Sequence, residues 1–119
     1  MTRESILNRA IECVCGEREQ DYGSPEDNFN RIATYWSTHL GMEITAEDVA
    51  VMMALLKIAR IGAGTATDDS WVDLAGYAAC GGEIAEKEAG RRKLAEMTKK
   101  AMQKLATGCV DTSQMATTI

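Results

Sequence analysis

The chain has 119 residues, 45% of them hydrophobic, and its 18 acidic and 13 basic side chains give a formal net charge of −5. This length corresponds to one domain with room for one modest core. No apolar run reaches 18 residues, so we expect no membrane-spanning helix. The acidic balance argues against a protein that wraps a nucleic-acid backbone.

The charge is divided unevenly along the chain. Residues 1–89 carry 7 basic and 16 acidic side chains, a balance of −9, whereas residues 90–119 carry 6 basic and 2 acidic ones, a balance of +4. Such a basic run is typical of a solvated helix face or of a segment that pairs with an acidic neighbour. The N-terminus lacks the apolar segment of a signal peptide, so we expect a cytoplasmic protein.

The cysteines fit a reducing compartment. A single C-x-C pair, Cys13 and Cys15, is the closest approach to a metal-binding spacing, and His39 is far from it in sequence. We therefore expect buried or idle thiols at Cys13, Cys15, Cys80 and Cys109 rather than a zinc site.

Two helices are predicted in the N-terminal part of the chain. The first spans about residues 3–16 and follows Thr2, a residue that favours the N-cap position. The second begins with Ser24 as N-cap and Pro25 as its first residue, and runs to about Leu40. Apolar residues recur at helical spacing in both. They are Ile6, Leu7, Ala10, Ile11 and Val14 in the first helix, and Phe29, Ile32, Ala33, Trp36 and Leu40 in the second.

The third predicted helix, Ala46–Ile61, is apolar on almost every side. Thr45 supplies its N-cap and Gly62 a stop signal. A helix without a polar face is normally buried on all sides, so we expect this one to be the centre of the fold. Its only charged residues are Glu47, Asp48, Lys57 and Arg60.

A fourth helix is predicted from Asp68 or Asp69 to about Ala89. Its expected apolar stripe contains Trp71, Leu74, Ala75, Ala78, Gly82 and Ala85. Three internal glycines indicate very close packing against another backbone. Those glycines are Gly76, Gly81 and Gly82.

The sequence predicts a break or kink at Gly90, then a polar helix over residues 91–106 with a thin apolar stripe, and a frayed tail over residues 107–119. No strand pattern is present, so the expected class is all-α. The predicted architecture is a four-helix bundle over residues 1–89 and a C-terminal helical arm over residues 90–119. The arm is too weakly apolar to fold alone, so we expect it to dock on the bundle or on a second subunit, and the protein to be a homo-oligomer, most simply a dimer.

Charged residues of the third and fourth helices are predicted to meet. Lys57 and Arg60 leave the end of one helix, and Asp69 and Asp73 open the next, after a short loop. In an antiparallel pair of helices these ends lie side by side, and we expect Asp73 and Arg60 to form a partly buried pair.

Two interpretations of these four residues stay open. One is a structural ion-pair cluster whose acids also complement the helix dipole. The other is a polar pocket for an anionic small molecule, with Mg²⁺ held by Asp69 and Asp73. The pocket would lie between the two helices and under the Asp21–Gly23 turn, where Asp21, Tyr22 and Asn28 would form a lid or a stacking ring.

Three motifs resemble a family of small phage and prophage proteins of unknown function. They are DYGSPEDNFNRIA at residues 21–33, LLKIAR at 55–60 and DSWVDLAGYA at 69–78, and the resemblance covers about residues 5–87. It implies a phage protein that works inside a bacterial host cell.

That family in turn is distantly similar to the MazG-like all-α nucleoside triphosphate pyrophosphohydrolases. This similarity implies an oligomeric helical bundle that holds Mg²⁺ with paired acids on two helices. Asp69 and Asp73 match the later acids, whereas Lys57 and Arg60 stand where paired glutamates are expected. A Lys/Arg pair repels Mg²⁺ and attracts phosphate.

The presence of Lys57 and Arg60 in place of the expected glutamates favours a protein that binds a nucleotide or another phosphate-bearing small molecule without a complete metal-hydrolase site. The alternatives are a MazG-like, Mg²⁺-dependent nucleotide pyrophosphohydrolase, and a phage accessory protein whose ion pairs are purely structural. The residues expected to bind the ligand are Lys57, Arg60, Asp69, Asp73, Asp21, Tyr22, Asn28 and Tyr77.

Overall fold

The computed structural model describes residues 1–16, 20, 23–65 and 67–118, with the backbone alone at residues 68 and 109–118. Its helices are α1 (Arg3–Cys15), α3 (Pro25–Leu40), α4 (Ala46–Gly62) and α5 (Asp68–Thr118). The described residues contain no strand, which confirms the predicted all-α class. Two compact units are present, Met1–Ala85 and Glu86–Ile119. The domain boundary expected after residue 89 stays a prediction.

Caps confirm the predicted starts of α3 and α4 and the predicted end of α3, whereas α4 includes Gly62 and has Ala63 as its C-cap. The Ser24 hydroxyl accepts a hydrogen bond from the Asp27 backbone N–H, at 3.2 Å. Gly41 ends α3 in the left-handed conformation, at φ 67°. At the start of α4, Thr45 and Asp48 form a reciprocal capping box with distances of 3.0 and 3.1 Å. Each such cap typically stabilises a helix by about 1 kcal/mol.

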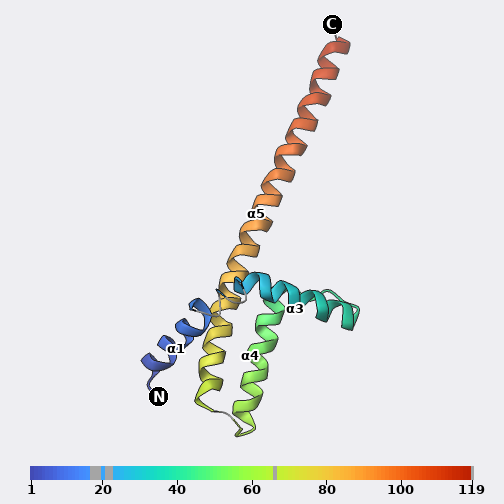
Figure 1. The fold of residues 1–119 in the computed structure, drawn as a ribbon. Helices are drawn as coiled ribbons and strands as arrows, with labels where there is room; N and C mark the ends of the chain where they lie inside the picture. Colours follow the sequence, from blue (N-terminus) through green and yellow to red (C-terminus); the bar gives the residue numbers. More distant parts are fainter. Residues whose placement is uncertain (17–19, 21–22, 66, 119) are drawn as a thin grey trace. The chain divides into compact units, whose positions relative to one another are not determined.

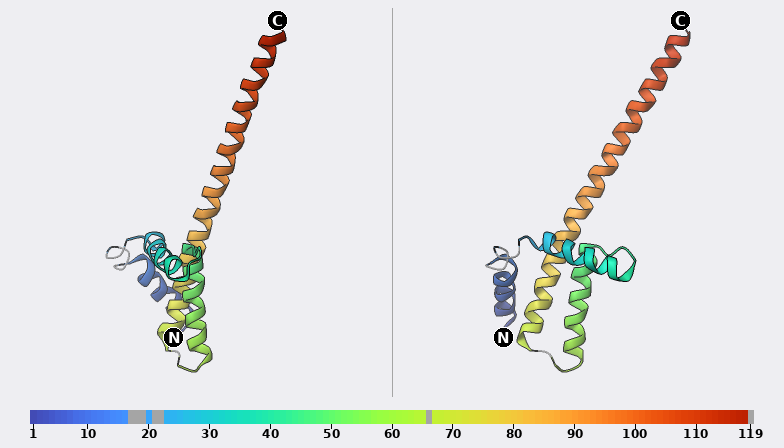
Figure 2. Two further views of the ribbon diagram at one scale, coloured as in Figure 1. Left: turned by 90° about the vertical axis from the view of Figure 1, so that its right-hand side faces the viewer. Right: turned by 45° about the vertical axis from the view of Figure 1, so that its right-hand side comes forward.

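The first part of α5 is the central helix of the 1–85 unit. Figures 1 and 2 show it between α1 and α4, with α3 crossing near one end of α4. The prediction that Ala46–Ile61 would be central was therefore wrong. The buried core draws on α3, α4 and α5, and consists of Phe29, Ala33, Ala46, Val49, Ala50, Cys80 and Ile84.

Glycine explains why α5 takes the central place. A Cβ added at Gly76 would lie 3.1 Å from Val14 Cγ1 in α1, and one at Gly81 would lie 3.0 Å from the Ala50 Cβ in α4. Two of the three predicted glycines are thus closely packed, but against side-chain atoms and not against another backbone. Gly82 differs, because a Cβ there would meet nothing within 4 Å.

Only one side of α4 is buried in the single chain. Ala46, Val49 and Ala50 are the buried residues of this helix. The other sides expose Val51, Met52, Leu55, Leu56 and Ile58, each by between 38 and 56%. The expectation of burial on all sides was therefore wrong; among the described helices, α5 and α3 are the ones that lie beside α4 in Figures 1 and 2.

Several other predicted core residues are also exposed. The buried side of α5 carries Val72, Gly76, Cys80 and Ile84, spaced by four residues, whereas Trp71 on the predicted stripe is 49% exposed. The helix has apolar residues on two sides, and the pattern alone did not show which side would be packed. The other exposed residues of the predicted stripes are Leu7, Ile11, Leu40, Ala78 and Gly82.

The break expected at Gly90 is absent, because α5 is helical from Asp68 to Thr118. One interior glycine costs a helix only about 1 kcal/mol relative to alanine, which its neighbours outweigh here. Fraying of the tail in solution stays a prediction. Within the described part of the chain, none of the helices combines the length and the apolar character that crossing a bilayer requires.

Candidate functional site

A small cavity lies where α1, the segment at residues 23–29 and α5 meet. Its volume is about 70 Å³, roughly that of two water molecules in the liquid. It is lined by Cys13, Val14, Gly23, Pro25, Asn28, Phe29, Val72, Asp73, Gly76, Tyr77 and Cys80. All of these residues belong to the 1–85 unit.

The cavity combines apolar walls with three polar side chains, Asn28, Asp73 and Tyr77. All three were predicted as ligand residues, and they come from two helices that are far apart in the sequence. The Phe29 and Tyr77 rings lie 6.2 Å apart with an interplanar angle of 39°, so they support one another. A few polar groups on an apolar surface are typical of a small-molecule site.

Local capping fixes the start of α5 and with it the position of the acids. The Thr67 backbone N–H donates to the hydroxyl of Ser70, at 3.3 Å, and Ser70 is buried. Asp69 and Asp73 therefore occupy the first two turns of the helix. They are four residues apart and lie on neighbouring parts of its surface.

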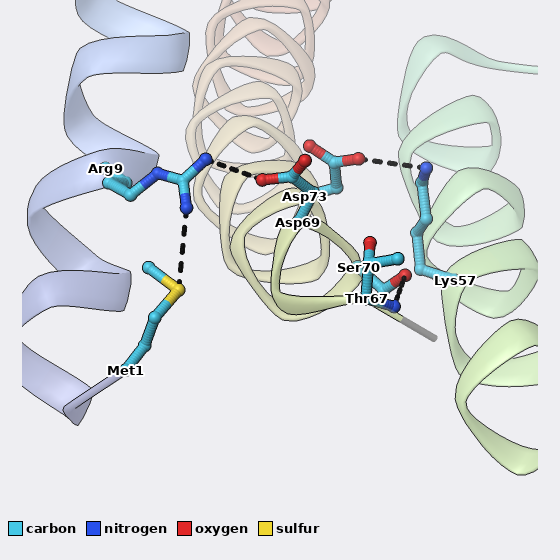
Figure 3. Close-up of polar contacts among 7 residues, drawn as sticks. All are labelled: Met1, Arg9, Lys57, Thr67, Asp69, Ser70 and Asp73. Carbon is cyan, nitrogen blue, oxygen red and sulfur yellow. Dashed lines mark hydrogen bonds and ion pairs between the residues drawn. The ribbon is translucent and has the colours of Figure 1, made fainter. Parts of the chain in front are cut away.

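Each of the two aspartates is paired with a cation from a different neighbouring helix. Lys57 Nζ of α4 lies 2.9 Å from Asp73 Oδ2, and the two side chains are 13% and 34% exposed. Arg9 of α1 donates to Asp69 Oδ1, in a pair that is 46% and 66% exposed. Figure 3 shows these charges in a row that links α1, α5 and α4.

The four charged residues predicted to meet do not form one cluster. Asp73 pairs with Lys57 rather than Arg60, so the predicted Asp73–Arg60 pair was wrong. Arg60 is exposed, and no ion pair joins it to another described residue. Asp69 points to Arg9, a residue that sequence reasoning missed, because nothing local to α1 marks its distant partner.

The cavity also differs from the predicted pocket in one wall. That pocket was expected between the end of α4 and the start of α5, but α1 rather than α4 supplies the wall opposite α5. Asp21 and Tyr22 lie outside the described residues, so their predicted role stays a prediction. Gly23, which follows them, lines the cavity.

Two thiols of the cavity, Cys13 and Cys80, were not predicted as site residues. Cys13 is exposed and Cys80 is buried. Their separation of 67 positions gives no sequence signal that they share a site. No group of three or more His, Cys, Asp or Glu side chains within the described part of the chain is placed to hold a metal ion.

Comparison with known proteins identifies relatives but no activity. Residues 5–85 match the family described as "Domain of unknown function (DUF6378)", and the match ends where the first compact unit ends. The "Gene 55 protein" of Mycobacterium phage L5 is 53% identical over 75 residues, which cover 62% of this chain and 48% of that protein. The "Gene 55 protein" of Mycobacterium phage D29 is 45% identical over 84 residues, covering 71% and 56%.

The chain thus spans about half the length of the curated relatives it matches. No solved structure matches the chain.

Proposed function

The chain belongs to this DUF6378 family, and we propose that it is a phage protein that binds a phosphate-bearing small molecule, of nucleotide type, at the cavity between α1, α3 and α5. One observation carries the proposal. Three residues singled out from the sequence, Asn28, Asp73 and Tyr77, line a single, largely apolar cavity although they come from two separate helices.

The side chains around the cavity suit the two ends of such a ligand. The tilted Phe29 and Tyr77 rings offer an apolar surface to a planar group, and the Asn28 amide can both donate and accept a hydrogen bond. Lys57 reaches the cavity lining through its contact with Asp73. Arg60 follows it by three residues and adds a second positive charge for a phosphate.

Binding must widen the cavity. At about 70 Å³ it is well below the roughly 300–1,000 Å³ of pockets that enclose drug-sized ligands. Part of the binding free energy is therefore spent on separating the packed helices, and an anion must also compete with Asp73 for Lys57. We accordingly propose a moderate affinity, in the micromolar to millimolar range.

The structure favours binding over metal-dependent hydrolysis. The similarity to MazG-like pyrophosphohydrolases stays a prediction, and it requires carboxylates that are available to Mg²⁺. Here Asp69 and Asp73 are each paired with a cation, and no third carboxylate joins them among the described residues. The donor set therefore does not fit a complete metal-hydrolase site.

Calorimetric titration tests the proposal. Nucleoside mono-, di- and triphosphates, cyclic dinucleotides and inorganic phosphate are titrated with and without Mg²⁺. Arg60→Ala should weaken binding by roughly tenfold to a hundredfold, because a charged hydrogen bond contributes about 1.5–3 kcal/mol. Arg31→Ala, which changes an exposed arginine of α3, is the matched control and should bind like wild type.

A second pair of variants tests the aromatic wall. Tyr77→Leu should weaken binding, whereas Tyr35→Leu should not, because Tyr35 is 70% exposed on α3 and does not line the cavity. If wild type binds nothing at millimolar concentrations, the proposal fails and the ion pairs are structural. If binding requires Mg²⁺ and a product accumulates, the hydrolase alternative is correct.

A further inference from the structure

The outer face of α4, defined by Val51, Met52, Leu55, Leu56 and Ile58, is an apolar surface that no other described residue covers fully. Each of its five side chains is between 38 and 56% exposed. The sequence from Val49 to Leu56 contains no polar residue at all. On the opposite side of this stretch, Val49 and Ala50 are buried in the core. Packing among the described residues therefore does not explain why the outer face is apolar.

The size of this face corresponds to one side of a stable interface. With about half of each side chain exposed, the apolar area is on the order of 400 Å², which is among the larger patches found on monomeric proteins. Apolar atoms make up roughly 57% of a typical interface. A contact built on this face would therefore bury roughly 700 Å² per copy, close to the standard of about 800 Å².

We infer that the outer face of α4 binds the same face of a second copy, in an antiparallel pair about a twofold axis. The charges at the ends of the helix favour this occupant and this direction. Glu47 and Asp48 lie at the N-terminal end, and Arg60 lies at the C-terminal end. Antiparallel pairing places the acidic end of each helix beside the basic end of the other, and it opposes the two helix dipoles.

A parallel pair would place like charges together at both ends of α4. A twofold antiparallel pair, in contrast, uses one self-complementary surface twice and leaves no apolar part of it in water. Leu55 is near the middle of the face and thus near the axis. The apolar face is separate from the cavity, because none of the cavity-lining residues lies on α4, but Arg60 is shared with the proposed ligand site.

Analytical ultracentrifugation of the chain at about 1–200 µM, which detects dissociation constants of this order, tests the inference. Wild type should be a dimer. Leu55→Lys should be a monomer with unchanged helical content by circular dichroism, because it places two charges against one another at the axis. Leu105→Lys is the matched control: it changes an equally large apolar side chain, 71% exposed in the second unit, and should remain a dimer.

If Leu55→Lys does not fold, Leu55→Ala replaces it and should raise the dimer dissociation constant about tenfold or more. The charge argument has its own test. Arg60→Glu should weaken the dimer, because it gives both ends of the helix pair the same sign of charge. A monomeric wild type, a dimer unaffected at position 55, or a dimer that Leu105→Lys dissociates equally would overturn the inference.

Discussion

Substituting alanine for Gly81 or Gly82 separates helix propensity from packing at two adjacent positions of α5. Both glycines are interior residues of the helix, and neither has a positive φ. In isolation each substitution should therefore stabilise the helix by about 1 kcal/mol. The structure predicts opposite outcomes for the folded protein.

The difference comes from the space around the new methyl group. At Gly82 a Cβ would meet nothing within 4 Å, so the propensity gain should be kept. At Gly81 it would lie 3.0 Å from the Cβ of Ala50, a rigid partner with no other rotamer. Overpacking of this kind costs about 1–3 kcal/mol, so Gly81→Ala should change stability by about 0 to −2 kcal/mol.

Thermal unfolding followed by circular dichroism at 222 nm measures both effects. For a unit of this size, about 1 kcal/mol shifts the Tm by roughly 4–8 °C. Gly82→Ala should therefore melt several degrees above wild type, and Gly81→Ala at or below it. The protein concentration must be the same for all three proteins, because any association shifts the Tm. Equal stabilisation by both substitutions would refute the close approach of α4 and α5.

Further predictions concern the ion pairs, a cap and the cavity thiols. Asp73→Asn should lower the free energy of unfolding by about 1–3 kcal/mol in urea titrations, because it leaves the largely buried Lys57 without its ion-pair partner. Asp69→Asn should change the same quantity by less than about 1 kcal/mol, because its ion pair is more exposed. Thr45→Ala should cost about 1 kcal/mol in the same titration through loss of the capping box. In the native protein iodoacetamide should modify the exposed Cys13 and not the buried Cys80, as mass spectrometry of peptides would show, and equal rates at both would contradict the described packing.

The parts of the fold that could be predicted from the sequence are those that depend on neighbouring residues. Ser24, Pro25 and Gly41 determine both ends of α3 within a few positions of themselves, and the structure confirms them. Close packing was predicted for three interior glycines because interior glycine is unfavourable without such a reason, and it is found at Gly76 and Gly81 but not at Gly82.

Which side of a helix is buried could not be predicted where a helix is apolar on two sides. In α5 the pattern favoured the side with Trp71, but the packed side is the one with Cys80 and Ile84. Choosing correctly requires knowing that α1 and α4 flank this helix. Without knowledge of the neighbouring helices, α4 also looked central, because the residues of its exposed outer face are as apolar as those of a buried core.

For the candidate site, too, residues in distinctive local motifs could be predicted and residues defined by distant contacts could not. Asn28, Asp73 and Tyr77 stood out because each lies in a distinctive local motif, and all three line the cavity. Arg9 and Cys80 did not stand out, since their importance depends on contacts with residues more than 50 positions away. A pattern of nearby residues carries no information about such partners.

The cavity gives the fold a sensitivity to hydrostatic pressure. The free volume of about 70 Å³ corresponds to about 40 mL per mole, and the contraction of proteins on unfolding scales with such volume without being equal to it. Loss of that whole volume on unfolding sets an upper limit, at which an increase of about 100 MPa lowers the free energy of unfolding by about 1 kcal/mol. Gly76 lines this cavity, but a side chain there would press on Val14, 3.1 Å from the added Cβ, before it filled the free volume.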